Sequence, residues 1–511
     1  MLSSGSSSLK VGRVLGHYGP LRYFRGLASY VSCDESELAV FLPEGLSGEV
    51  ENEFHFTGKR KWMERDAGKV VKAWIDNHSR KGKAKQGIAE GEGSGAKINI
   101  YRYGANIMKD VSDEKLVVEA FSGKLKLMED DGLKGGKPDR VVLTGERGVG
   151  KSVILSQAVI HARKKGWLCL FVPNAFDHSH GGMYVEPLPG KSGLYDNTTM
   201  SASLLRGFYQ AHRKEIDTIP IKDVALLEKY NKHITKFQGK WDLALKVPGR
   251  EDLAFTDMRA IILGDDFDED EYGPDRELLA DFDFLSLQPK TLGDLVRMGL
   301  AFHDFSGAAV LDLVSELREL DQEGMPVLFA VDQMNTWEHM TPYQYRDHYL
   351  HSRDIAVPKA LSFVTRKKTT VEDWTIKNGL CLGATSFKHE PTKGWETYAA
   401  SMSSIPLTIE VPVYSKAEFE AALDHYDLDT MTERSPSAQE IEAFRMSVGN
   451  NPLQMMRHIT KYMYGLSADD AVADSMATRE DEGLQEMEGL LEASNALLDS
   501  AIGDHAKKAG A

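Results

Sequence analysis

The sequence is poor in cysteine, has no long apolar run and carries no excess of positive charge. Its three cysteines, Cys33, Cys169 and Cys381, lie far apart among 511 residues, which excludes a disulfide framework and suits a reducing compartment. No apolar run approaches the roughly 18 residues that span a bilayer. The formal net charge of −16 gives no electrostatic support for a DNA-binding protein, although a local basic face can still contact RNA.

The first segment, residues 1–29, contains four basic residues, many serines and no acidic residue. This composition is typical of a mitochondrial targeting peptide, and the other interpretation is a disordered basic tail. Residues 30–110 lack clear periodicity and predict an extension draped over a partner or over the main domain, with a flexible linker at residues 80–97. Its basic cluster with a tryptophan, residues 59–62, is either an RNA contact or, as is more usual for such runs, a solvated face.

The most informative stretch is residues 145–152, GERGVGKS, which follows a β-branched run at residues 141–143. It matches G-x-x-x-x-G-K-S, the phosphate-binding loop. Glycines let successive backbone N–H groups form a concave nest for anionic oxygens. Lys151 is then predicted to reach the terminal phosphates, and the Ser152 hydroxyl to hold a magnesium ion.

The flanks of this loop predict a βαβ unit. Residues 153–162 have helical spacing, and Lys164, Lys165 and Gly166 form a typical helix end. The apolar run WLCLFV at residues 167–172 then predicts a strand buried on both faces. The alternative, a chance match in an ordinary glycine turn, does not account for this context.

A second motif, VLFAVD at residues 327–332, resembles the Walker B pattern. A buried parallel strand would place Asp332 at its carboxyl end, where ligands bind in such sheets. Ser152 and Asp332 are therefore the predicted magnesium ligands. Gln333 follows at a position where many ATP-hydrolysing proteins have a glutamate base, and glutamine cannot accept the proton. The sequence thus favours nucleotide binding over fast turnover, and no catalytic residue is assigned.

Other parts of the sheet domain are less specific. Residues 291–320 have helical patterning, and residues 378–386 predict a buried strand. Thr385 or Ser386 at its end is either a γ-phosphate sensor or a simple strand-end hydroxyl. Residues 405–413, with prolines at both ends, predict an edge strand. An acidic run within residues 226–288 is more typical of a solvated loop than of a divalent-cation site.

The chain changes character near residue 415. Three helices are predicted, the first capped by Ser415 and the others near residues 438–448 and 452–464. An acidic tail rich in alanine and leucine follows. The expected organisation is a targeting peptide at 1–29, an extension at 30–110, a nucleotide-binding domain at 111–413, a helical lid domain at 414–466 and a helical tail at 467–511.

Several stretches together resemble one known family, the death-associated protein 3 family of P-loop GTP-binding proteins in the mitochondrial small ribosomal subunit. The resemblance covers roughly residues 111–466. The stretches are GERGVGKS (145–152), KKGWLCLFVP (164–173), LGDLVRMG (292–299), LFAVDQMN (328–335), EFEAALDHY (418–426) and GNNPLQMMRH (449–458).

The resemblance implies an AAA+-like α/β fold, with a parallel sheet flanked by helices and a small C-terminal helical lid. It also implies a place in the head of the small subunit, in the mitochondrial matrix, with ribosomal RNA and neighbouring ribosomal proteins as partners. The implied cofactors are Mg²⁺ and a mainly structural GTP or GDP. The implied nucleotide-binding residues are Gly145, Glu146, Arg147, Gly148, Val149, Gly150, Lys151, Ser152 and Val153.

Two other functions stay open at this stage. One is a switch-type NTPase acting in ribosome assembly or apoptotic signalling, which would need an activating residue that the sequence does not identify. The other is a DNA-transaction ATPase, against which the net charge and Gln333 both argue. Guanine and adenine are not distinguished by the residues themselves, because no N-K-x-D stretch is present, so GTP follows from the resemblance alone.

Overall fold

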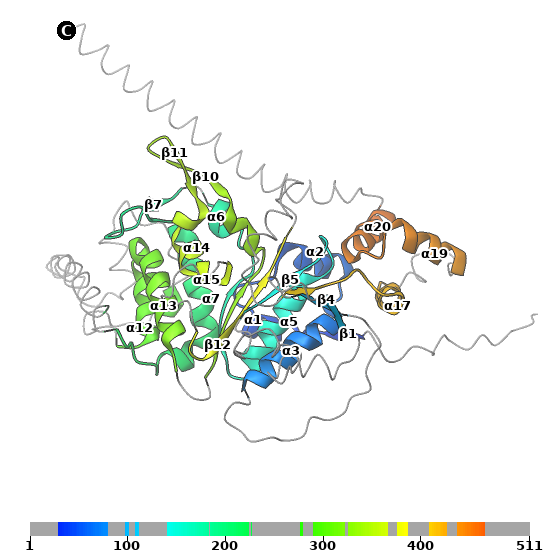
Figure 1. Ribbon diagram of the computed structural model, residues 1–511, viewed down its shortest axis with the longest axis horizontal. Coiled ribbons are helices and arrows are strands. Elements are labelled where there is room, and N and C mark those ends of the chain that lie inside the picture. The colour runs from blue at the N-terminus through cyan, green and yellow to red at the C-terminus, as the bar shows by residue number, and fades with distance from the viewer. Residues whose placement is uncertain are drawn as a thin grey trace, which may run out of the picture.

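The computed structural model describes residues 29–79, 98–101, 108–111, 140–182, 184–223, 226, 276–279, 290–321, 325–365, 376–386, 408–426 and 437–464. Within these ranges, seven strands form one sheet in the order β4-β3-β13-β5-β12-β9-β6 (Figure 1). The five strands from β13 to β6 are parallel, and β3 and β4 add an antiparallel pair. Their bounds are β3 Ile98–Tyr101, β4 Met108–Val111, β5 Arg140–Thr144, β6 Leu168–Val172, β9 Val327–Val331, β12 Gly379–Ala384 and β13 Thr408–Glu410.

Strand β6 shows how the sheet divides the core. Leu168, Leu170 and Val172 lie in one hydrophobic cluster, whereas Cys169 and Phe171 lie in another. Successive side chains of a strand point to opposite faces, so a strand covered on both faces must be apolar throughout. This explains why the central strands read as unbroken apolar runs in the sequence.

Helices cover both faces of the sheet (Figure 1). Helices α7, α12, α13, α14 and α15 contribute to the first cluster, and α2, α3 and α5 contribute to the second, with α1 packed against it. A parallel sheet flanked by helices on both faces is the predicted fold class, and it is confirmed. The helices are α1 Glu35–Phe41, α2 Gly48–Thr57, α3 Asp66–Ser79, α5 Lys151–Lys164, α7 Thr198–Ile216, α12 Leu292–Ala301, α13 Ser306–Glu319, α14 Ala356–Ala360 and α15 Ser362–Thr365.

Smaller elements complete the described part of the domain. Short antiparallel pairs of strands lie outside the main sheet. One of them, the β10–β11 hairpin, projects from the body in Figure 1. Their bounds are β1 Ser29–Ser32 with β2 Lys61–Glu64, β7 Glu186–Pro187 with β8 Tyr195–Asp196, and β10 Met340–Tyr345 with β11 His348–His351. The short helices are α6 Asp177–His180, α11 Arg276–Leu279, and the 3-10 turns His303–Phe305, Met334–Glu338 and Ser352–Asp354.

Residues 291–320 form two helices rather than one continuous helix. Thr291 begins α12 with a capping box, and the backbone leaves the helical region at Phe302. A 3-10 turn follows. Helix α13 begins at Ser306, whose hydroxyl donates to the Gly299 carbonyl at 2.8 Å. The apolar periodicity continues across this break because both helices pack on the same cluster.

Strand β13 is an interior strand, so the predicted edge position is wrong. It pairs in parallel with β5 on one side and antiparallel with β3 on the other. The described strand spans only Thr408–Glu410, and Pro412 lies beyond it. The proline therefore does not remove a donor from the ladder, and the signal that predicted an edge marks only where the strand ends.

The segment of residues 29–79, here called the N-terminal segment, packs on the main domain rather than extending toward a partner. The Gln157 amide of α5 donates to the Met63 carbonyl at 3.1 Å, and His161 of α5 bonds Asp76 of α3 at 2.9 Å. Trp62 is 7% exposed and lies in the same cluster as α5. The RNA-contact interpretation is therefore wrong for this tryptophan, which is a core residue.

The three predicted C-terminal helices are confirmed as α17 Lys416–His425, α19 Ala438–Ser447 and α20 Pro452–Tyr464. Ser415 caps α17, as predicted, and Ser437 caps α19 in the same way. The three helices, here called the C-terminal helices, share a small core that includes Phe419, Val448 and Met455. In Figure 1 they lie together, beside the sheet.

Several sequence predictions fall outside the described residues. These are the targeting peptide apart from Ser29, the linker at 80–97, the acidic run within 226–288, and the tail from 467 onward. In the part of the chain that the structure describes, no helix combines the length and the apolar character needed to cross a membrane.

Candidate functional site

The glycine-rich loop, residues 145–152, connects β5 to α5, as the motif predicts. Two of its glycines are required by close contacts as well as by positive φ angles. A Cβ atom on Gly145 would lie 2.3 Å from the Val411 carbonyl oxygen, and one on Gly148 would lie 2.3 Å from Leu453 Cβ. The loop is therefore enclosed between the chain after β13 and the start of α20.

Three successive carbonyl groups of the loop accept hydrogen bonds from outside it. Asn451 Nδ2 donates to the Arg147 carbonyl at 2.8 Å, and the Leu453 amide donates to the Gly148 carbonyl at 3.2 Å. Arg65 Nη1 donates to the Val149 carbonyl at 2.6 Å. Each donor comes from a segment distant in sequence.

These bonds determine where the loop amides point. In a trans peptide the N–H of the next residue lies opposite the carbonyl group. Carbonyls held by outside donors therefore direct the amides of residues 148–150 away from those donors, toward the other side of the loop. Helix α5 begins at Lys151 and adds the positive end of its dipole. Amides directed to one side of a loop at the start of a helix have the orientation that an anion nest requires.

Lys151 is the cation of the loop, and its side chain lies back along it. Its Nζ donates to the carbonyls of Gly145 at 2.8 Å and Glu146 at 2.6 Å. Burial lowers the pKa of Lys151 to about 8, against the opposing effects of Asp332, Glu49 and Glu146. A buried ammonium group gains from an additional anion nearby, and a phosphate group would supply one.

The two predicted magnesium ligands lie together. Asp332 directly follows β9, and its carboxylate accepts hydrogen bonds from the Ser152 hydroxyl and, at 2.8 Å, from the Gln333 amide. Burial raises the pKa of Asp332 to about 6, which these two bonds and Lys151 oppose. One carboxylate and one hydroxyl fit a Mg²⁺ ion that keeps water and phosphate oxygens as its other ligands.

The residue after Asp332 has an unusual backbone. Gln333 lies in the left-handed region at φ 56° and ψ 31°, and its buried Oε1 atom has no hydrogen-bond partner among the residues that the structure describes. Downstream, Asn335 Nδ2 donates to the Ser386 carbonyl at 2.6 Å, and the Ser386 amide donates to Asn335 Oδ1 at 2.8 Å. This reciprocal pair connects the end of β12 to the chain after Asp332.

Thr385 has a structural partner at the end of β12. Its hydroxyl donates to the Leu143 carbonyl of β5 at 3.3 Å, and its amide donates to the same oxygen at 3.0 Å. The side chain is buried, at 2% exposed. The strand-end interpretation of this hydroxyl therefore has direct support, and the sensor interpretation has none from Thr385.

The remaining predicted nucleotide-binding residues differ in exposure. Glu146 and Arg147 are exposed, Val149 is buried and Val153 packs partly against the second cluster. Arg147 Nη2 lies 3.3 Å from Glu49 Oε1 of α2, with both side chains about 40% exposed (39% and 41%). The N-terminal segment thus also contacts the loop from its solvent side.

Sequence reasoning missed two residues that organise the loop, Arg65 and Asn451. The Asn-Asn-Pro stretch at residues 450–452 is a helix-start signal, and Asn451 Oδ1 does accept the amides of Leu453 and Gln454. This signal could have indicated the cap but not its second bond to Arg147. No local pattern around Arg65 indicates a contact 84 positions away.

Two comparisons with known proteins agree in family. The model of the family described as mitochondrial ribosomal death-associated protein 3 matches residues 119–458. The chain is also 30% identical over 142 residues to the small ribosomal subunit protein mS29 of Neurospora crassa. That alignment covers 24% of this chain and 30% of the relative, so it spans less than a third of the relative's length.

Proposed function

The chain belongs to the mitochondrial ribosomal death-associated protein 3 family, and from this premise we propose that it is a structural protein of the mitochondrial small ribosomal subunit. In this proposal it lies in the head of the subunit and contacts ribosomal RNA and neighbouring ribosomal proteins. Membership in this family locates the chain in the mitochondrial matrix.

The proposal includes a nucleotide with Mg²⁺ in the glycine-rich loop. The observation that carries it is the set of three outside donors, Asn451, Leu453 and Arg65, which orient the loop amides as an anion nest. The Ser152–Asp332 contact beside Lys151 adds a place for the cation. We propose a guanine nucleotide because of the family resemblance, since the described contacts do not distinguish the base.

We further propose that the domain is AAA+-like and that the C-terminal helices are its lid. In support, β12 lies between β5, which precedes the loop, and β9, which Asp332 directly follows. The start of α20 also covers the loop, because the Leu453 amide bonds the Gly148 carbonyl. A small helical unit that touches the phosphate-binding loop has the position expected of a lid.

The nucleotide is proposed to act as a structural ligand rather than as a substrate for hydrolysis. Gln333 occupies the position beside Asp332 where a glutamate base would be needed, and an amide cannot accept a proton from water. A ligand that binds only the folded state stabilises it by mass action, by about 2.7 kcal/mol at a hundredfold excess over its Kd. The bound loop would therefore support folding and assembly.

Lys151→Ala tests this function. We expect the variant to lose the rise in thermal midpoint that GTP and Mg²⁺ produce in the wild type, and to enter small subunits poorly. The matched control is Lys164→Ala, at the other end of the same helix, where the side chain is 48% exposed. Equal stabilisation by nucleotide and equal incorporation in Lys151→Ala would refute the proposal.

The nucleotide itself is best identified in native material. Mass spectrometry of small molecules released from purified mitochondrial small subunits that contain this protein should find GTP or GDP in about equal amount to the protein. Single-turnover hydrolysis separates the structural role from a switch NTPase. Rapid phosphate release that Asp332→Asn abolishes would favour the switch.

A further inference from the structure

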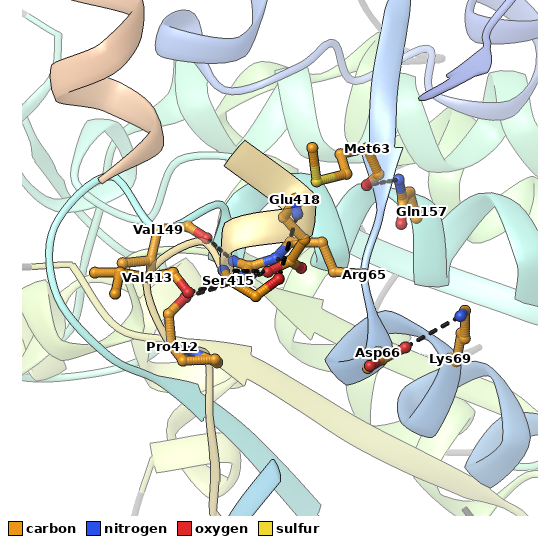
Figure 2. Close-up of polar contacts among 10 residues, drawn as sticks. All are labelled: Met63, Arg65, Asp66, Lys69, Val149, Gln157, Pro412, Val413, Ser415 and Glu418. Atoms are coloured by element: carbon orange, nitrogen blue, oxygen red, sulfur yellow. Dashed lines mark hydrogen bonds and ion pairs between the residues drawn. The ribbon is translucent and has the colours of Figure 1, made fainter. Parts of the chain in front are cut away.

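Arg65 lies between the N-terminal segment, the glycine-rich loop and the C-terminal helices. It follows β2 and precedes α3, and its side chain is 5% exposed. Figure 2 shows its guanidinium group directed toward Val149, the 412–413 connection and Glu418. The residue lies outside the region that the family model matches, residues 119–458.

The contacts of Arg65 use all three guanidinium nitrogens. Nη1 donates to the Val149 carbonyl at 2.6 Å, and Nη2 donates to the Pro412 and Val413 carbonyls at 2.9 and 3.2 Å. Nε donates to Glu418 Oε1 at 2.7 Å, and Nη2 lies 3.3 Å from Oε2 of the same carboxylate. The guanidinium also lies 5.1 Å from the centre of the Tyr414 ring. One side chain therefore joins three separate segments.

Glu418 also determines where helix α17 begins. Its Oε2 accepts the Ser415 amide at 2.8 Å, and the Ser415 hydroxyl accepts the Glu418 amide at 3.3 Å. This is a capping box, in which both terminal amides are satisfied reciprocally. Because Arg65 binds the same carboxylate, the position of the loop carbonyl and the start of α17 depend on one ion pair (Figure 2).

Only arginine can make this set of contacts. Its planar fork presents five N–H donors in fixed directions, whereas the lysine ammonium is a point charge on a flexible chain. A lysine at position 65 can keep the charge beside Glu418. It cannot reach the Val149 carbonyl, the 412–413 carbonyls and the carboxylate together.

We propose that Arg65 is a positioning residue that couples nucleotide binding in the glycine-rich loop to the docking of the C-terminal helices. Its bond to Val149 keeps the Gly150 amide directed into the nest, and its bonds to residues 412, 413 and 418 hold α17 in place. A nucleotide that tightens the loop therefore tightens α17, and the coupling is reciprocal. This inference rests on the proposed function, since it requires that the loop binds a nucleotide.

The coupling predicts two measurable effects in the full-length chain. In the wild type, GTP with Mg²⁺ should slow hydrogen exchange both in the loop and in α17 and α20. In Arg65→Lys the nucleotide should bind about tenfold more weakly, the effect of losing one hydrogen bond to a charged donor. It should still protect the loop but no longer protect α17. A merely structural arginine would lower stability without changing this pattern of protection.

A second variant and a control complete the experiment. The hydrogen bonds described for Glu418 are to Arg65 and Ser415 and not to the loop, yet Glu418→Gln should also weaken nucleotide binding and remove the protection of α17. Arg60→Lys is the control, because Arg60 lies in the same segment, pairs with Glu35 at 2.8 Å and is 42% exposed. It should behave as the wild type does.

The outcomes separate this inference from the proposed function. If the wild type binds neither GTP nor ATP, the proposed function fails and the coupling fails with it. If the wild type binds nucleotide, and Arg65→Lys binds it equally well with the same protection of α17, only the coupling is overturned.

Discussion

The Arg163 guanidinium forms a buried two-bond ion pair with the Glu44 carboxylate, with nitrogen–oxygen distances of 2.5 and 2.9 Å. The side chains are 3% and 4% exposed. Arg163 also donates to the carbonyls of Phe41 and Cys169 at 2.6 and 2.9 Å. The pair therefore joins the N-terminal segment, helix α5 and strand β6 in one place.

Breaking this pair should destabilise the fold strongly. In Glu44→Gln a buried guanidinium loses its counter-charge, and removing one partner of a buried pair costs about 3–5 kcal/mol. The control is Glu37→Gln on α1, whose partner Lys164 is 48% exposed; a surface pair contributes about 0–1 kcal/mol. Urea unfolding at neutral pH measures both, and equal midpoints for the two variants would contradict the prediction.

The loop glycines offer a matched pair of substitutions. Gly148 and Gly150 have φ angles of 81° and 90°, so an alanine at either carries a similar backbone cost of about 1–2 kcal/mol. Of these two alanines, the one at position 148 would place its methyl group against Leu453 of α20, whereas no atom of the described residues lies within 4 Å of a methyl group at position 150. Both variants should therefore carry the backbone cost, and Gly148→Ala should in addition displace α20 from the loop.

Limited proteolysis and hydrogen exchange of residues 452–464 can distinguish these variants. We expect faster cleavage and exchange in this helix for Gly148→Ala, and rates near those of the wild type for Gly150→Ala. The same undocking in both variants would mean that backbone strain, rather than the contact with Leu453, explains the effect.

A buried histidine predicts acid sensitivity. His212 Nε2 accepts the Cys169 amide at 2.9 Å, a bond that requires the unprotonated nitrogen. Burial first, and then Arg163 nearby, lowers the pKa of His212 from 6.5 to about 3. The folded state thus binds fewer protons than the unfolded state between these two values. The free energy of unfolding therefore carries no penalty from His212 above pH 6.5. As the pH is lowered through this window, the free energy of unfolding decreases by about 1.4 kcal/mol per pH unit.

His212→Gln removes this titration and keeps an acceptor for Cys169. Relative to its stability at pH 7, we expect the variant to gain about 2 kcal/mol over the wild type at pH 5. Burial raises the pKa of Asp196 to about 6, an effect of opposite sign that is present in both proteins and cancels in the difference. Parallel curves of unfolding free energy against pH would exclude the role of His212.

The central strands and the loop were predictable because their signals are local. Strands β6 and β9 are buried on both faces, so each reads as five consecutive apolar residues. The glycine-rich loop requires particular residue types at fixed spacing, and Asp332 follows its strand directly. In each case the physical constraint acts within about a dozen residues.

The contacts that organise the loop were not predictable, because they are distant in sequence. Arg65 and Glu418 are separated by 353 positions, and Asn451 lies 304 positions from Arg147. Nothing in a window around Arg65 distinguishes it from a surface arginine. Likewise, the prolines near residues 405–413 predicted a strand at the edge of the sheet. The pairing of β13 with β3 depends on a segment about 300 residues earlier in the sequence, which no local pattern reveals.

The last prediction concerns turnover. Gln333 follows Asp332, and within the described part of the chain its buried Oε1 atom has no hydrogen-bond partner. Gln333→Glu would place a carboxylate there, and a general base contributes about 10²–10⁴-fold to such reactions. We expect single-turnover GTP hydrolysis at least about tenfold faster than in the wild type. Gln333→Asn is the control, since asparagine tolerates the left-handed backbone at this position but cannot accept the proton.

This comparison decides between the two roles of the nucleotide. If Gln333→Glu hydrolyses GTP rapidly while the wild type and Gln333→Asn do not, the site has the geometry for hydrolysis and lacks only a base. In that case this chain would keep its proposed nucleotide intact because the side chain at position 333 cannot remove a proton from water. If the wild type already releases phosphate as fast as the variant, another group acts as the base, and the nucleotide must be treated as a substrate whose loss would loosen the contacts of Asn451 and Arg65 with the loop.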